Sequence, residues 1–471
     1  MRQYIRDSFS RDQVIISIFA VVILSIFCFI ANIPMAAPLI LYLLGVYLFY
    51  FRKAKFRTLL HLGFLLALIV FAAHSILEYS LLSTFYIPIA SVAMLTMLLF
   101  SDLQLAFLMS LAASAVVTLV VAGDFNYFLT FFMGSVAGVF TVRNARTRGK
   151  LISGGIVVGM IQSAASLLLN PAFNRDILLY GFKPLFLNGL ICCSIVFAAM
   201  KVFEWLFGEI TNFTLLELAD SSNQPLLKRM VLEAPGTYHH SLIVSNLSEA
   251  AADAVGAHGL LARVGAYYHD IGKLEKPEYF TENQMIAGNK HDSLEPTMSK
   301  LVILNHVKEG IELAKKHRLN HKIIDFIPEH HGTGIIYYFY QRALEAGEEV
   351  KDEDFRYPGP KPQTRETAIV LLADSVEGAT RSLDDHNPVK IGEVVRKIVN
   401  NKFIDGQLDE CDLTLKDIEV ICNTFTRVLS AMYHGRVRYP EKKSNGNHGN
   451  KSSKEDSDQN SDDKKNHQQN S

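Results

Sequence analysis

The sequence contains few cysteines, almost no net charge and little strand-like alternation of polar and apolar residues. Its five cysteines form no CxxC pair and three lie within long apolar runs, which argues against a disulfide framework and suits a reducing compartment. Lysine and arginine number 46 against 47 aspartates and glutamates, so no basic excess favours nucleic-acid binding. What the chain has instead is apolar residues, which occupy 49% of its 471 positions.

The longest apolar runs are confined to the first 207 residues. A helix that crosses a bilayer needs roughly 20 mainly apolar residues. Eight runs meet or approach that length: Val14–Ala31, Met35–Phe51, Thr58–Leu77, Thr84–Phe100, Leu105–Ala122, Tyr127–Val142, Leu151–Leu169 and Pro184–Phe207. The first run is too long for the apolar core of a signal peptide, and we interpret it as an anchor. This part is therefore predicted to be a polytopic transmembrane helical bundle.

The basic residues indicate how these spans are oriented. They cluster before the first span and in the loops at 52–57 and 143–150, whereas the loops EYSLLS and GDFN contain acids and no bases. With eight spans, all three basic clusters lie on the same side as both termini, and the positive-inside rule assigns that side to the cytoplasm. We therefore expect a multi-pass protein of the cell membrane whose C-terminal half is cytoplasmic.

Three further segments are predicted after the transmembrane region, residues 1–207. Residues 208–236 have the pattern of two amphipathic linker helices. Residues 237–440 show the three- and four-residue apolar spacing of helices, and this segment is long enough to bury its own core. The tail, residues 441–471, has almost no hydrophobic residues and is predicted to be disordered. The predicted fold class is thus all-α throughout.

Polar side chains interrupt the apolar helices of the C-terminal half. A histidine–aspartate pair ends an apolar run in VGAYYHDIGKLEKPEYF, residues 264–280, and similar intrusions occur elsewhere. In sequence order the set is His240, His269, Asp270, His306, His330, His331 and Asp374. One such histidine is commonly a hydrogen-bonded core residue, but seven polar residues within 135 positions are costly to bury without compensation. Bound metal ions would provide that compensation.

The order H…HD…D and the stretch HDIGK resemble the HD-domain metal-dependent phosphohydrolases, and the additional histidines resemble the members that hold two metal ions. Longer stretches, among them EAPGTYHHSLIVSNLSEAA, IIDFIPEHHGT and PGPKPQTRETAIVLLADSVEGATRSL, are similar to the bacterial seven-transmembrane HD phosphodiesterases of the PgpH type, which hydrolyse cyclic di-AMP. The resemblance covers about residues 35–440. It implies a membrane bundle followed by a cytoplasmic, all-helical HD phosphohydrolase domain.

Two departures from related patterns are visible. Family members often carry a large extracytoplasmic domain between an N-terminal anchor and the seven spans, and only Asn32, Ile33 and Pro34 occupy that place here. We therefore expect no sensory input through such a domain. The Gly-Tyr-Pro element of the HD-GYP enzymes, which act on cyclic di-GMP, is absent after His331.

The resemblance implies a site for two divalent metal ions. One ion would be held by His240, His269, Asp270 and Asp374. The other would be held by Asp270, His306, His330 and His331, so that the Asp270 carboxylate bridges them. Imidazoles and carboxylates without thiolates suit manganese or iron. A hydroxide shared by the two ions would attack phosphorus and open cyclic di-AMP to 5′-pApA.

Two basic residues are expected to bind the phosphates of the substrate. Lys273 lies about one helical turn after Asp270, and the two are the expected catalytic residues. Arg381 lies two turns after Asp374 and is expected to contact the second phosphate. The alternative for Lys273 is a solvated lysine at a helix end.

Other histidines and aromatic residues keep two interpretations. His239 adjoins His240, but neighbouring helical residues point about 100° apart. The resemblance implies that His240, which directly precedes Ser-Leu, is the ligand, and His239 is expected to face solvent or to lie behind the ligands. His291 is either a surface loop residue or part of the substrate site. The aromatic residues at 338–340 either pack in the core or offer a ring on which adenine stacks.

The residues leave other functions open. The domain can be a dimetal phosphohydrolase for another cyclic dinucleotide or nucleotide, or a membrane receptor that binds a nucleotide without cleaving it. A transporter is a third alternative, although no charged or broken membrane helix supports it. The expected partners are a cyclic dinucleotide and the lipid bilayer, with no nucleic acid, and a homodimer is left open.

Overall fold

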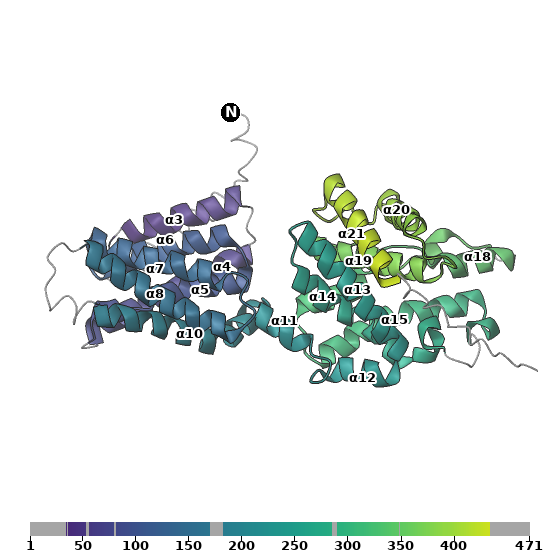
Figure 1. The fold of residues 1–471 in the computed structure, drawn as a ribbon, viewed down its shortest axis with the longest axis horizontal. Coiled ribbons are helices and arrows are strands. Elements are labelled where there is room, and N and C mark those ends of the chain that lie inside the picture. Colours follow the sequence, from purple (N-terminus) through teal and green to yellow (C-terminus); the bar gives the residue numbers. More distant parts are fainter. Residues whose placement is uncertain are drawn as a thin grey trace, which may run out of the picture. The chain divides into compact units, whose positions relative to one another are not determined.

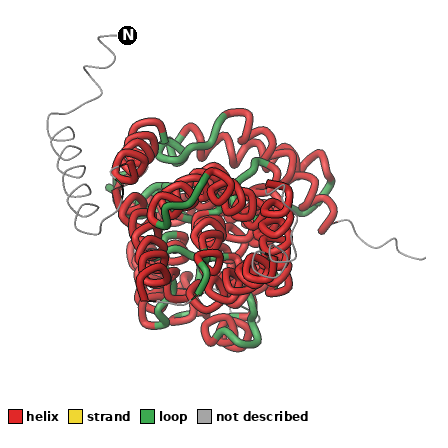
Figure 2. Tube along the Cα trace, turned by 90° about the vertical axis from the view of Figure 1, so that its left-hand side faces the viewer, coloured by secondary structure: helices red, strands yellow, loops and turns green. Residues whose placement is uncertain are grey.

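The structure is a computed structural model that describes residues 34, 36–52, 56–79, 82–169, 182–284, 290–347 and 349–433. Every regular element among these residues is a helix, as Figure 2 shows, and the single bridge of β type joins Ile335 to Arg356. The prediction of an all-α fold is confirmed. The predicted anchor at Val14–Ala31 and the predicted tail at 441–471 lie outside the described residues.

The described part of the N-terminal half consists of helices that run alongside one another (Figure 1). In chain order these are α3 (Ala36–Val46), η1 (Tyr47–Phe51), α4 (Phe56–Tyr79), η2 (Thr84–Tyr86), α5 (Ile89–Phe100), α6 (Leu103–Val120), α7 (Phe125–Val142), α8 (Arg148–Leu169) and α10 (Lys183–Phe207). Five of them, α4, α6, α7, α8 and α10, are long and apolar enough to cross a membrane. The apolar helices at Ala36–Phe51 and Thr84–Phe100 are shorter. Helices therefore occupy most of the described part of each of the seven runs predicted from Met35 onward.

The local sequence explains how these helices begin and pack. Asp102 and Asp124 precede α6 and α7, and their carboxylates accept hydrogen bonds from backbone N–H groups of the first turn at 3.0 and 2.8 Å. Helices α8 and α10 pack closely because Gly159 of α8 faces the backbone of Phe186 in α10. A Cβ atom on Gly159 would be only 2.5 Å from the backbone oxygen of Phe186.

The C-terminal half begins with α11 (Asn212–Leu218) and α12 (Pro225–Glu233), the two helices predicted between the membrane bundle and the site. The remaining elements are α13 (Pro235–Ala254), α14 (Gly259–Tyr268), η4 (Ile271–Glu275), η5 (Pro277–Tyr279), η6 (Thr281–Asn283), η7 (Lys290–Ser293), α15 (Pro296–Lys316), α16 (His321–Ile324), α17 (Phe326–Glu329), α18 (Tyr337–Glu345), η8 (Asp352–Phe355), α19 (Arg365–Arg381), α20 (Pro388–Ile404) and α21 (Leu415–Tyr433). The domain boundaries at 207, 236 and 440 stay predictions.

The core of this half is built around α13, α14 and α19, which contact one another, and η4 packs against α15. Helix α19 is buried continuously from Thr367 to Ala373, as expected of a central helix. Its N-terminus is capped by Thr364, and Pro235 occupies the first turn of α13, where its missing N–H group needs no partner. These helices form the rigid frame from which the predicted site residues project.

Candidate metal centre

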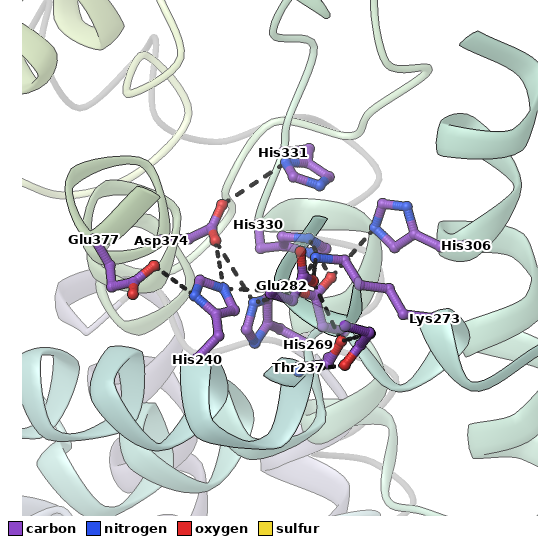
Figure 3. Close-up of polar contacts among 12 residues, drawn as sticks. Thr237, His240, His269, Lys273, Glu282, His306, His330, His331, Asp374 and Glu377 are labelled. Carbon is purple, nitrogen blue, oxygen red and sulfur yellow. Dashed lines mark hydrogen bonds and ion pairs between the residues drawn. The ribbon is translucent and has the colours of Figure 1, made fainter. Parts of the chain in front are cut away.

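Seven side chains from five segments meet inside the C-terminal half (Figure 3). His240 projects from α13, His306 from α15 and Asp374 from α19, while the other four directly follow α14 and α17. The seven form two groups of four whose ligand atoms all lie within 4.8 Å of one another: His240, His269, Asp270 and Asp374, and Asp270, His306, His330 and His331. The structure thus brings together every residue of the predicted ligand set, with Asp270 in both groups.

The two oxygens of Asp270 face different groups. Oδ2 lies 3.1 Å from Nε2 of His269 and 3.6 Å from Nε2 of His240. Oδ1 lies 3.5 Å from Nε2 of His306 and 3.6 Å from Nε2 of His330. A carboxylate with one oxygen turned toward each set of imidazoles has the arrangement that a bridging ligand requires.

Buried atoms without a hydrogen-bond partner give a test of whether these residues suit metal ions. Four of them belong to the seven residues: Nε2 of His269, His306 and His330, and Oδ1 of Asp270. Unpaired polar atoms in a protein interior are destabilising, by about 1–3 kcal/mol each. Because all four point into the same space and are nitrogen or oxygen donors, the set fits divalent first-row ions.

Hydrogen bonds on the side facing away from the centre fix the orientation of the histidine rings. In three of them Nδ1 lies within hydrogen-bonding distance of a backbone carbonyl of the preceding turn: His269 with Ala266 at 2.6 Å, His306 with Ile303 at 2.5 Å and His330 with Ile327 at 2.7 Å. A carbonyl only accepts, so Nδ1 must carry the proton. Each neutral ring therefore presents the lone pair of Nε2 to the centre, which is the tautomer of a metal ligand.

His240 is oriented by a carboxylate instead of a carbonyl. Its Nδ1 lies 2.6 Å from Oε2 of Glu377, and both side chains are buried. Its Nε2 lies 3.0 Å from Oδ1 of Asp374. Sequence reasoning missed Glu377, although one signal was available: it follows Asp374 by three residues on a helix that is otherwise buried on that side.

His331 differs from the other histidines because it is partly open to solvent. Its side chain is 22% exposed, and its ring is stacked on Tyr357 with the ring centroids 4.1 Å apart. Its Nδ1 lies 3.9 Å from Oδ2 of Asp374. The open side of the centre is therefore at His331 and Asp374, which is 15% exposed, whereas Asp270 is almost completely enclosed.

The charges of the centre balance one another in the absence of ions. Burial by itself disfavours a charged imidazole, but hydrogen bonds to Asp374 and Glu377 outweigh burial and raise the pKa of His240 to about 9. Burial is likewise outweighed at His269, where Asp270 raises the pKa to about 10. Burial opposes ionisation of Asp270 and Asp374 as well, yet the neighbouring cations hold both carboxyl pKa values well below their usual range.

Two histidines of the other ligand group, His306 and His331, behave differently. Burial lowers the pKa of His306 to about 4, with only partial compensation from Asp270. Burial and the neighbouring imidazoles His330 and His306 hold the pKa of His331 well below its usual range. These two rings are neutral at pH 7 and can accept a metal ion without first losing a proton, whereas His240 and His269 must release one.

Lys273 is not a solvated helix-end lysine. Its side chain is only 13% exposed, and Nζ lies 2.8 Å from Oδ2 of Asp270 and 2.8 Å from Oε1 of Glu282. Burial disfavours the ammonium, but these two carboxylates outweigh it and raise the pKa of Lys273. The solvated alternative is therefore wrong, and the structure holds a permanent positive charge against the centre.

Glu282 was not identified from the sequence, and it depends on contacts made across the fold. Thr237, in the first turn of α13, donates through its hydroxyl to Oε1 of Glu282 at 3.2 Å. The backbone N–H of Thr237 donates to Oδ1 of Asn283 at 3.1 Å. A Cβ atom on Gly236 would be 1.8 Å from the backbone oxygen of Glu282. Glycine at 236 therefore permits the segment to lie against α13.

Arg381 lies beside the centre rather than in it. Its side chain is 43% exposed, and Nη1 is 3.9 Å from Oε1 of Glu377. Arg381 lines a cavity of about 460 Å³, the polar cavity, together with Gly236, His239, Thr281 and Glu282. His239 thus faces this cavity, in agreement with its exclusion from the ligand set.

Burial decides the alternatives for His291, Phe339 and Tyr338. His291 is 2% exposed, and its Nε2 lies 2.9 Å from the backbone oxygen of Tyr279, so the surface interpretation is wrong. Core packing is correct for Phe339, which is 6% exposed. It is wrong for Tyr338, which is 58% exposed and lines a second cavity together with His291.

Both halves of the chain match known protein families. Residues 33–211 match the family model described as 7TM receptor with intracellular HD hydrolase, and residues 237–379 match the HD domain model. The cyclic-di-AMP phosphodiesterases PgpH of Bacillus subtilis (strain 168) and Listeria monocytogenes serotype 1/2a (strain 10403S) are each 40% identical to this chain over 76% of its length. In each case the alignment covers 51% of the relative, so the chain spans about half the length of these proteins.

Among solved structures, the L. monocytogenes PgpH HD domain in complex with cyclic di-AMP is 48% identical to the matched part of this chain. The match covers 45% of this chain and 99% of the solved one, with a TM-score of 0.44.

The apolar helices of the N-terminal half and the seven-transmembrane match together mark a membrane protein. The chain therefore belongs to the family of seven-transmembrane receptors with an intracellular HD hydrolase domain.

Proposed function

We propose that the chain is a membrane-anchored phosphodiesterase that uses two metal ions to hydrolyse cyclic di-AMP to 5′-pApA. The observation that carries this proposal is the convergence of two four-residue ligand groups on the two oxygens of Asp270. Two bound ions would supply an activated water for attack on phosphorus and would neutralise charge on the phosphate oxygens. The substrate is proposed from the relatives, whose names state that they act on cyclic di-AMP.

The protein's own residues then hold and orient the reacting groups. Asp270 would serve both ion sites, and its burial keeps its side chain in place. Lys273, already 2.8 Å from Asp270, supplies a positive charge beside the phosphate that is cleaved. Glu282 holds the Lys273 ammonium in that position from the opposite side. Arg381, at the edge of the polar cavity, is suited to the second phosphate of the ring.

The ligand set also supports a choice of metal. Five imidazoles and two carboxylates with no thiolate suit manganese or iron better than magnesium, which prefers oxygen ligands. The basic clusters on one side of the predicted spans support a cytoplasmic location for this half. A site on the cytoplasmic side would have access to a cyclic dinucleotide dissolved in the cytoplasm.

Product analysis with the full chain in detergent tests the proposal. The chain loaded with manganese or iron is expected to convert cyclic di-AMP to 5′-pApA, with little turnover of cyclic di-GMP. Asp270→Asn is expected to abolish turnover, because both ion sites lose their shared ligand. Asp385→Asn is the matched control: Asp385 is ion-paired with Lys390 at the surface, 2.8 Å away.

Two outcomes would count against this function. Asp270→Asn turning over cyclic di-AMP at the native rate would remove the metal centre from the reaction. Binding of cyclic di-AMP by the loaded chain without any product would indicate the nucleotide-binding receptor instead of the enzyme.

A further inference from the structure

A second cavity adjoins the metal centre on the side of His306. It has a volume of about 380 Å³ and is lined largely by aromatic side chains; we call it the aromatic cavity. Its apolar and aromatic lining comprises Tyr279, Phe280, His291, Ile303, Tyr338 and Phe339. We propose that the aromatic cavity binds one purine base of the dinucleotide, stacked on Tyr338. This inference rests on the proposed function, since it assigns a subsite to that substrate.

The wall of the aromatic cavity is in direct contact with the centre. The ring of Phe280 lies 5.8 Å from the ring of His306, and Nζ of Lys273 lies 5.0 Å from the Phe280 ring centroid. On the same side, Ile303 supplies the backbone oxygen that fixes Nδ1 of His306. A substrate phosphate beside Lys273 would therefore have a base-sized space next to it.

The aromatic cavity and the polar cavity share one wall. Thr281 and Glu282 line both of them, and Glu282 is ion-paired to Lys273. A cyclic dinucleotide has two bases on opposite sides of a ring that contains two phosphates. A cavity on each side of the Glu282–Lys273 pair suits that shape, with Arg381 available to a phosphate on one side and aromatic rings to a base on the other.

The rings at the floor of the aromatic cavity hold one another in place, whereas the ring of Tyr338 is exposed and can contact a ligand. The rings of His291 and Phe339 lie 5.0 Å apart, and Tyr279 lies 5.5 Å from His291, so these rings support one another. Tyr338 contacts Phe339 edge-on at 5.1 Å, yet it is 58% exposed. The guanidinium of Arg342 lies over the Tyr338 ring, 5.8 Å from its centroid, so a base would stack on the face opposite Arg342. Flat, aromatic walls of this kind bind nucleobases by stacking.

The cavity also has the dimensions of a small-molecule site. Ligand pockets typically enclose about 300–1,000 Å³ and combine apolar walls with a few polar groups. At about 380 Å³ the aromatic cavity lies at the lower end, which suits one base rather than a whole dinucleotide. The carboxylate of Glu282 at its edge adds a hydrogen-bond acceptor, which an exocyclic amino group of a purine can use.

Neighbouring tyrosines of α18 allow a matched test. Tyr338→Ala removes the proposed stacking ring, and Tyr337→Ala removes an adjacent tyrosine that is 64% exposed and does not line the cavity. Stacking on an aromatic side chain contributes about 1–3 kcal/mol per base, so Tyr338→Ala is expected to raise the KM for cyclic di-AMP by about 5- to 150-fold. Tyr337→Ala is expected to leave it within about twofold of the native value.

Three further measurements separate stacking from a general defect. Tyr338→Ala is expected to keep the native metal content and the native melting temperature, because the ring is 58% exposed and belongs to neither ligand group. Tyr338→Phe keeps the ring and is expected to restore the native KM for cyclic di-AMP. For a phosphorothioate analogue of cyclic di-AMP that resists hydrolysis, Tyr338→Ala should raise the Kd and Tyr338→Phe should leave the Kd at its native value.

The results that overturn this inference differ from those that overturn the proposed function. A native KM for cyclic di-AMP in Tyr338→Ala would remove the subsite while leaving the enzyme assignment intact. A loss of bound metal or a lower melting temperature in Tyr338→Ala would indicate a structural role for the ring. A native chain that cleaves bis(p-nitrophenyl) phosphate but not cyclic di-AMP would instead refute the proposed substrate.

Discussion

Replacing Glu377 by glutamine tests how the metal centre is organised. Glu377 lies 2.6 Å from Nδ1 of His240 and is completely buried. The carboxylate requires a proton on Nδ1, which leaves the lone pair of Nε2 for an ion. Glutamine has nearly the same shape but no charge, and its NH₂ group can donate to Nδ1. The proton then moves to Nε2, where it blocks the ion.

The expected size of the effect follows from this geometry. Carboxylates and carbonyls that orient a metal-binding histidine typically change metal affinity by about 10- to 100-fold when they are altered. That range corresponds to about 1.4–2.7 kcal/mol. Because His240 belongs to only one ligand group, the loss should fall on one of the two ions and leave the other close to native affinity.

Titration calorimetry with manganese, on the full chain in detergent, measures both ions. Glu366→Gln is the matched control, since Glu366 lies on the same helix and accepts a hydrogen bond from the backbone of His258, away from the centre. In a His240→Ala background, Glu377→Gln should cause no further loss. Native affinity for both ions in Glu377→Gln, or an equal loss in the His240→Ala background, would refute the argument.

Three further predictions follow from the surroundings of the centre. Gly272→Ala should lower the melting temperature, with a cost of about 1–3 kcal/mol, because the new Cβ would lie 1.8 Å from the backbone oxygen of His306; thermal denaturation measures this. Lys273→Met should lower kcat for cyclic di-AMP by about 10²–10³ while the metal content, measured by elemental analysis, stays native. The third concerns the pH dependence of the metal-free chain. Its fold raises the pKa values of His240 and His269 from the usual 6.5 to about 9 and about 10. The free energy that their protonation contributes to folding is therefore fully present below pH 6.5 and is lost as the pH rises through 9–10. The melting temperature without metal should therefore fall between pH 7 and 10, and an unchanged value would contradict these shifts.

Much of the site was accessible from the sequence because its ligands are polar residues in otherwise apolar helices. His306 within LVILNHVKEG and Asp374 within AIVLLADSVEGA stand out for this reason. Lys273 also followed from its spacing after Asp270. Its burial did not, because burial depends on Glu282, which reaches Lys273 from a different segment.

Other features had no local signal. The surface interpretation of His291 was wrong because its enclosure comes from Tyr279 and Phe339, which belong to other segments. The exposure of Tyr338 could not be separated from the burial of Phe339 by composition, since both are aromatic and adjacent. Which of them lines a cavity depends on the direction in which α18 is turned.

The sequence by itself determined the helical class, the apolar runs of the N-terminal half and the set of candidate ligands, since apolar periodicity and polar intrusions are properties of short stretches of chain. Only the tertiary structure decided which oxygen of Asp270 faces which imidazoles, that Glu377 holds His240 from a position 137 residues away, and that two cavities meet at Glu282. The physical reason is that distances, tautomers and cavities arise from packing between segments that are remote in the chain, and no local pattern encodes them.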